Sequence, residues 1–88
     1  MKVEYRKTFL KDLSRIPLKV RTGIEKFAFT ELPQTESIAQ IGRVERMKGY
    51  PSFYKVRFGP YRVGIRYESG IVVLERVLHC MEIYRYFP

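Results

Sequence analysis

The sequence has 88 residues, enough for one modest hydrophobic core, so we expect a single domain spanning residues 1–88. Its 17 Lys and Arg against 9 Asp and Glu give a net charge of +8, which favours nucleic acid as a partner, then an acidic protein, and a membrane surface last. One cysteine and one histidine exclude an internal disulfide and a zinc set, and no glycine motif suggests a phosphate-binding cofactor loop.

The N-terminal segment alternates like a strand and lacks the long apolar run of a secretory signal. We read residues 2–6 as a strand, expect a cytoplasmic protein with no membrane partner, and take Thr8 as a candidate N-cap. A first short amphipathic helix follows and ends before Pro17, because a residue preceding proline disfavours helical geometry. Its apolar stripe is Phe9, Leu13 and Ile16.

A second helix is expected to start at Pro17 and to pair with the first as a helical hairpin. One face carries Val20, Ile24, Phe27 and Ala28, a stripe that indicates core packing rather than a cofactor site. Residues 32–37 predict a turn-rich connection that continues into a short helical turn through Ile38 and Ile41.

The middle of the chain predicts three strands. Residues 43–48 alternate charged with apolar side chains, and residues 49–52 interrupt the pattern. Residues 53–67 then form two alternating runs joined by Gly59-Pro60, which suits a two-residue type II′ turn. This turn places Phe58 opposite Tyr61 and therefore Arg57 opposite Arg62.

The predicted hairpin has one apolar face and one cationic face. The apolar face holds Tyr54, Val56, Phe58, Tyr61, Val63 and Ile65, and the cationic face holds Lys55, Arg57, Arg62 and Arg66. Like charges on adjacent strands destabilise a sheet unless an anion or solvent relieves them. The pattern therefore fits an anion-binding face, or equally an open antiparallel face whose long cationic side chains extend into water.

After a turn at residues 68–70, residues 71–78 form a β-branched strand buried on both faces over much of its length. Whether Arg76 joins the cationic face depends on a register that the sequence leaves open. Residues 79–88 predict a short helix or tail ending at Phe87. The expected fold is α+β: an N-terminal strand and a helical hairpin on a curled, mainly antiparallel sheet of about four strands, with this short C-terminal element.

Three segments carry a resemblance to a known family. Residues 47–51 (MKGYP) resemble a Leu-(Lys/Arg)-Gly segment, residues 54–63 (YKVRFGPYRV) resemble a Tyr-(Lys/Arg)-x-(Lys/Arg)-x-Gly-x-Tyr-Arg hairpin, and residues 77–85 (VLHCMEIYR) resemble a closing His-Arg-x-Glu-(Ile/Val)-Tyr-Arg block. Together with the element order, they resemble the RelE/ParE superfamily of toxins from bacterial and archaeal toxin–antitoxin systems. The resemblance spans essentially the whole chain and implies a RelE-like fold.

For the RelE-like branch, the resemblance implies a ribonuclease that cleaves mRNA in the ribosomal A site with the RNA's own 2′-OH as nucleophile and no metal. The positions matching the family's catalytic residues are Lys55, Arg57, Arg62 and Tyr84. Cys80 stands where relatives carry an arginine, which puts a phosphate contact or the rate in doubt. The implied partners are the ribosome, mRNA and an acidic RelB-like antitoxin in a hetero-oligomer.

The chemistry suggests a role for each side chain. Arg62 would clamp the scissile phosphate, Arg57 would support its developing charge, and Lys55 would act as base if neighbouring cations favour its neutral form. Tyr84 would stack on a base or hold the nucleotide by its hydroxyl, and His79 is either the proton donor to the leaving oxygen or a structural residue. The remaining candidate RNA-binding cations are Arg43, Arg46, Lys48, Arg66 and Arg85.

Two other functions fit the same fold. A ParE-like toxin inhibits DNA gyrase without depending on these hairpin cations. A catalytically weakened member would only bind RNA or the antitoxin. This alternative remains because Cys80 stands in place of the family's arginine.

Overall fold

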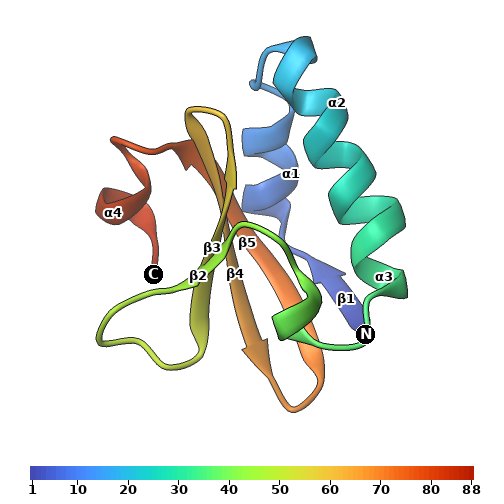
Figure 1. Cartoon of the computed structure of the whole chain (residues 1–88). Helices are drawn as coiled ribbons and strands as arrows, with labels where there is room; N and C mark the ends of the chain where they lie inside the picture. The colour runs from blue at the N-terminus through green and yellow to red at the C-terminus, as the bar shows by residue number, and fades with distance from the viewer.

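The computed structural model describes residues 1–88 as a five-stranded sheet with helices on both of its faces (Figure 1). In chain order the elements are β1 (Lys2–Tyr5), α1 (Lys7–Leu13), α2 (Leu18–Lys26), a π-helical turn (Phe27–Glu31), α3 (Leu32–Gln34), a 3-10 turn (Ile38–Gln40), β2 (Val44–Arg46), β3 (Phe53–Phe58), β4 (Tyr61–Glu68), β5 (Ile71–His79) and α4 (Ile83–Tyr86). None of the helices has the length and apolar character needed to cross a bilayer.

The strands lie in the order β1-β5-β4-β3-β2. Strands β2 to β5 form an antiparallel meander, and β1 adds to it in parallel, with Lys2 beside Ile71. The predicted α+β fold is confirmed. Residues 2–5 form the expected first strand, but as a parallel edge strand of the sheet itself.

The central hairpin has the predicted register. Phe58 pairs with Tyr61 and Arg57 with Arg62, so only Gly59 and Pro60 connect the strands. Gly59 has a φ of 57°, the positive value that the first central position of a type II′ turn requires. Alternation along both strands then separates the apolar from the cationic side chains as the sequence predicts.

Helix α1 begins without a side-chain cap. Arg6 occupies the N-cap position, so the prediction that Thr8 caps the helix is wrong. Thr8 lies in the first turn instead, and its hydroxyl donates a hydrogen bond of 2.8 Å to the carbonyl of Glu75 on β5. A tertiary contact with the sheet has replaced the local capping bond.

The second helical segment is longer than predicted. The turn expected from Leu32 onward begins only at Thr35, because a π-helical turn and α3 continue α2 as far as Gln34. Leu32 is fully buried, which favours keeping it on the helix that faces the core. Pro33 would clash with the carbonyl four residues earlier in a regular helix, and the wider π-helical turn before it accommodates the ring. The short turn at residues 38–40 occurs as predicted.

The helical layer and the apolar face of the sheet enclose the main core. It contains Phe9, Leu13, Ile16, Ile24, Phe27, Ala28, Leu32, Ile41, Val56, Phe58, Val63, Ile65, Val72, Leu74 and Val77. The predicted stripes of both helices supply the helical side of this cluster, although Ile16 lies beyond the end of α1.

Strand β5 contains a bulge that changes which residues face the core. Leu74 pairs with Ile65, and Arg76 pairs with Gly64. Because Gly64 and Ile65 are adjacent on β4, Glu75 has no pairing partner there and forms the bulge. The alternation shifts by one position at this point. Beyond the bulge, Val77 points into the main core instead of away from it.

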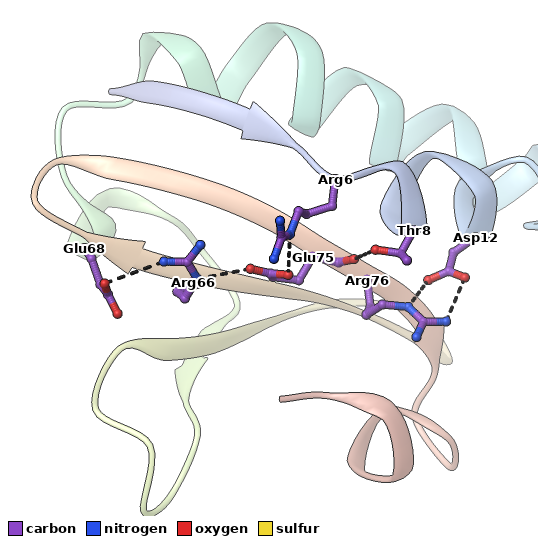
Figure 2. Close-up of polar contacts among 7 residues, drawn as sticks. All are labelled: Arg6, Thr8, Asp12, Arg66, Glu68, Glu75 and Arg76. Atoms are coloured by element: carbon purple, nitrogen blue, oxygen red, sulfur yellow. Dashed lines mark hydrogen bonds and ion pairs between the residues drawn. The ribbon is translucent and has the colours of Figure 1, made fainter.

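Side chains of helix α1 form hydrogen bonds with the outer edge of β5 beyond the point where β1 ends (Figure 2). The buried carboxylate of Asp12 accepts hydrogen bonds from the Val77 amide at 3.1 Å and from Arg76 Nε and Nη2 at 2.7 and 3.0 Å. This pairing raises the pKa of the Arg76 guanidinium above its ordinary value and keeps the group charged. Side chains of α1 thereby satisfy a strand edge that would otherwise remain open.

The opposite face of the sheet carries a second, smaller apolar cluster beneath α4. It consists of Met47, Ile83 and Phe87, with Phe53 and Leu78 packed against it. Gly64 lies directly under Phe87, and a Cβ there would approach the Phe87 ring to 2.7 Å. The prediction that this whole face is cationic is therefore wrong for the half that α4 covers.

Candidate active site

The half of this face that α4 leaves uncovered carries the hairpin cations. Their cavity, of about 270 Å³, is lined by Arg43, Val44, Glu45, Lys55, Arg57 and Arg62. Arg57 and Arg62 face each other across β3 and β4, and Lys55 lies two positions before Arg57 on the same face. The structure thus brings the three predicted hairpin residues together around one hollow.

Lys55 is largely enclosed, with 14 % of its side chain exposed. Its Nζ lies 3.1 Å from Glu45 Oε1 and 4.3 Å from the centroid of the Tyr84 ring. A carboxylate and an aromatic face each attract a cation, so both contacts hold the Lys55 side chain in place. In this position its ammonium group can put positive charge next to an anion in the hollow.

Glu45 is the site residue that the sequence prediction missed. It pairs with Lys55 across β2 and β3, so both side chains lie on the same face. Alternation within residues 43–48 puts Glu45 on one face of its strand, but the connection to β3 is too long to fix the register between the two. Only the opposite charges of Glu45 and Lys55 could have suggested the pair.

The two arginines keep donors available. Arg62 Nη1 donates to the carbonyls of Gly59 and Tyr61 at 2.8 and 3.0 Å, which anchors the guanidinium at the hairpin turn and leaves its Nε and Nη2 without a protein partner. Arg57 is exposed and makes no ion pair. An anion held between these side chains would relieve the repulsion between them.

Tyr84 reaches the site from α4. Ile83, just before Tyr84, and Phe87, three residues after it, are buried in the second apolar cluster and hold this short helix on the sheet. The Tyr84 ring is 62 % exposed while lying against Lys55. It is therefore available to a ligand that occupies the cationic hollow.

His79 lies on the other side of the sheet from these residues. The bulge in β5 places it opposite Tyr61 on the helical side, with the two ring centroids 5.7 Å apart. Its Nδ1 accepts a hydrogen bond from the Met81 amide at 3.2 Å and lies 3.8 Å from Cys80 Sγ. The structure does not bring His79 together with the hairpin cations.

Two arginines form ion pairs within the protein: Arg66, which the sequence predicted to bind RNA, and Arg76, whose face the sequence left open (Figure 2). Arg66 pairs with Glu75 at 3.1 Å and with Glu68 at 3.6 Å, although it shares the face of Lys55. Arg76 is bound by Asp12 and does not join the cationic hollow. Carboxylates of the protein itself thus hold both guanidinium groups.

The other predicted RNA-binding residues lie around the site. Arg43 has a φ of 63° just before β2, and its guanidinium carbon lies 5.1 Å from the Phe58 ring centroid, at the rim of the hollow. Arg46 and Lys48 border a separate cavity beside Tyr50, and Arg85 is exposed on α4. No three side chains of His, Cys, Asp or Glu are grouped to hold a metal ion.

Comparison with known proteins identifies the family. A model described as "ParE toxin of type II toxin-antitoxin system, parDE" matches residues 3–84. Toxin RelE3 of Methanocaldococcus jannaschii is 38 % identical over the full length of both chains. The chain belongs to the RelE/ParE toxin superfamily. It is a RelE-family toxin of a type II toxin–antitoxin system, as the motifs of the hairpin and the closing block predict.

Solved structures of RelE proteins have the same fold as this RelE-family toxin. A RelB–RelE antitoxin–toxin complex from Methanococcus jannaschii superposes with a TM-score of 0.81 at 35 % identity, covering 97 % of this chain and 99 % of the other. A mutant of the Escherichia coli toxin RelE in the free state gives a TM-score of 0.66 at 20 % identity, covering 96 % and 90 %. At that lower identity the likeness concerns the fold alone.

Proposed function

We propose that this RelE-family toxin is an endoribonuclease that cleaves mRNA in the ribosomal A site by attack of the RNA's 2′-OH on the adjacent phosphate. The observation that carries the proposal is the hollow on the uncovered half of the sheet, where Lys55, Arg57 and Arg62 surround one position and Tyr84 borders it. Such a reaction needs positive charge, a proton acceptor and a fixed nucleotide, and side chains of this chain offer all three.

The two arginines are assigned to the phosphate. Arg62 is anchored at the turn through one nitrogen and offers its remaining donors to the non-bridging oxygens. Arg57, directly opposite, supports the charge that develops on those oxygens and on the departing 5′-oxygen, which takes its proton from water. The repulsion between the two side chains in the free protein makes a bound phosphate more favourable.

The proton acceptor is assigned to the pair formed by Lys55 and Glu45. Glu45 Oε1 lies 3.1 Å from Lys55 Nζ and 70 % of the Glu45 side chain is exposed, so the carboxylate is accessible to the RNA's 2′-OH while the lysine supplies positive charge. We therefore assign the acceptor role to Glu45 and charge stabilisation to Lys55. Lys55→Arg keeps the charge and should retain part of the cleavage rate, while Glu45→Gln should lose most of it; the reverse order would restore Lys55 as the base.

The cleavage rate that we expect depends on Cys80 and His79. Cys80 supplies no cation at the position where relatives have an arginine, and its thiol lies against the His79 ring. His79 is directed away from the hollow, so we assign it a structural role at the end of β5. Cleavage slower than that of relatives with the arginine is the expected result.

The partner of this toxin is proposed to be a small acidic RelB-like antitoxin in a hetero-oligomer. The solved complex from Methanococcus jannaschii pairs a RelE chain with RelB. The +8 charge of the present chain complements an acidic partner. Co-expression with the neighbouring gene should restore growth and yield a co-purifying complex, and neither result is expected if the toxin acts alone.

Gyrase inhibition is the second candidate function, because the matching family model is named for ParE. The deciding experiment is primer extension on mRNA from programmed ribosomes treated with purified protein, beside a gyrase supercoiling assay. Cuts at the A-site codon that disappear with Arg62→Ala are expected. Arg21→Ala, which removes the same charge from α2, serves as the matched control and should cut normally. Supercoiling inhibition without cuts would support the ParE-like alternative instead.

A further inference from the structure

The loop that connects β2 to β3 exposes an aromatic ring at a cavity that two unpaired cations also line. Tyr50 is 50 % exposed beside a cavity of about 500 Å³ that is lined by residues 46–51. Arg46 and Lys48 make no ion pair, and no acidic side chain lines the cavity. The loop therefore presents positive charge and an aromatic surface at the same place.

Hydrogen bonds and packing hold this loop in place. Backbone bonds of 2.8 Å from Met47 to Phe53, 3.0 Å from Tyr50 to Met47 and 3.1 Å from Phe53 to Tyr50 close it at its base. Met47 is buried in the second apolar cluster, and Gly49 has the φ of 83° that the turn requires. The Tyr50 ring is thus kept in a defined position although half of it faces solvent.

The accessible surface of the ring suits a flat ligand. Tyr50 meets Phe53 edge to face, with centroids 6.2 Å apart and an interplanar angle of 88°. None of the chain's own cations lies over the Tyr50 ring, in contrast to the Tyr84 ring, which Lys55 approaches. A nucleobase can stack there while Arg46 and Lys48 contact its phosphates, the combination that proteins use to bind single-stranded nucleic acid.

We propose that Tyr50, Arg46 and Lys48 form a second nucleotide subsite, which holds a base of the same single-stranded mRNA outside the cleavage site. This inference rests on the proposed function and assigns two of the candidate RNA-binding cations to the substrate mRNA. It also gives Tyr50 a binding role, because the ring lies outside the main core.

The second subsite lies within reach of the first. Phe53 and Lys55 are two residues apart on one face of β3, about 7 Å along the strand. The ring centroids of Tyr50 and Phe53 lie 6.2 Å apart. A short extended RNA segment can therefore contact Tyr84 and Tyr50 together, with the half-buried Phe53 between them.

Binding of an uncleavable RNA tests the subsite. The probe is a fluorescein-labelled 2′-O-methyl oligoadenylate, and its dissociation constant is measured by anisotropy at two salt concentrations. Tyr50→Ala should weaken binding roughly tenfold or more, and Tyr50→Phe should bind normally because it keeps the ring. Arg46→Ala with Lys48→Ala should weaken binding and lower the salt dependence. Tyr86→Ala, which removes an equally exposed ring outside both subsites, is the matched control and should leave affinity unchanged.

Different outcomes separate this inference from the proposed function. If Tyr50→Ala binds as tightly as the wild type while Arg62→Ala does not, the second subsite is overturned and the cleavage site stands. If the wild type neither binds the probe nor cuts mRNA on ribosomes, both fail. If Tyr50→Leu, which preserves apolar packing on Phe53, binds like Tyr50→Phe, packing rather than stacking explains the residue and the subsite is again overturned.

Discussion

The two faces of the sheet use the same strands for different purposes. The face under α1 and α2 is one continuous apolar cluster in which Phe9, Ile24 and Leu74 are fully buried. The opposite face is divided into a small apolar cluster beneath α4 and an open cationic hollow. Neighbouring residues of β3 therefore face opposite sides of the sheet: Val56 faces the helices, and Arg57 faces the cationic hollow.

This difference separates stability from activity along a single strand. Hydrophobic burial on the helical side supplies most of the driving force for folding, since the second cluster has only three buried members. The opposite side can then carry the facing pair of Arg57 and Arg62 at small cost, because Arg57 is exposed and solvent screens its charge. Substitutions on the helical side should therefore lower stability more than cleavage, and substitutions in the cationic hollow should lower cleavage more than stability.

Leu74→Ala should give the largest loss of stability. The side chain is fully buried in the main core, and its truncation leaves a cavity that the neighbouring strands cannot fill. The free energy of unfolding in urea should fall by about 3 kcal/mol. A loss below about 1 kcal/mol would show that this face repacks easily.

Asp12→Ala should rank second. It leaves the Val77 amide and the partly buried Arg76 guanidinium without their acceptor. Urea denaturation should show a loss of about 2 kcal/mol. Asp12→Ala combined with Arg76→Met removes the unpaired charge, so the double variant should recover part of the loss; complete additivity would contradict the pairing.

Gly64→Ala should act on the divided face alone. Its new Cβ would meet the Phe87 ring, so α4 must shift and carry Tyr84 away from Lys55. We expect about 1.5 kcal/mol of destabilisation, and hydrogen exchange should increase at residues 83–87 but not in α2. Cleavage should fall more than stability does. Unchanged hydrogen exchange in α4 would show that Gly64 is not needed for this helix to pack on the sheet.

Arg57→Ala should have the smallest effect on stability. The side chain is exposed and faces Arg62, so its loss removes a repulsion and should change the free energy of unfolding by no more than about 0.5 kcal/mol. Cleavage should nevertheless fall strongly in primer extension. An equal loss from Lys19→Ala, an exposed cation on α2, would mean that overall charge and not position matters.

The hairpin was predictable because local chemistry determines it. Gly59 and Pro60 set the turn, and the alternation from Tyr54 to Ile65 allows only one register with a consistent apolar face. The position of Arg57 beside Arg62 follows from that register, and so does the site's cationic character.

Long-range contacts account for what the sequence could not predict. The face of His79 depends on a single extra residue at Glu75, which is held by Thr8 and Arg6 from the other end of the chain. No local pattern marks this bulge, and a shift of one position reverses every side chain after it. The pairing of Glu45 with Lys55 was hidden for a related reason, since two strands joined by a long loop carry no local signal for their register.

The parallel pairing of β1 with β5 has a consequence for synthesis of the toxin. Lys2 needs Ile71 as its neighbour, so the first strand to leave the ribosome has no partner until the fifth strand has been translated. Contacts this distant in sequence close slowly, and the helical hairpin cannot bury its apolar stripes before the sheet exists. The sheet can therefore be completed only after residues 71–74 have been synthesised.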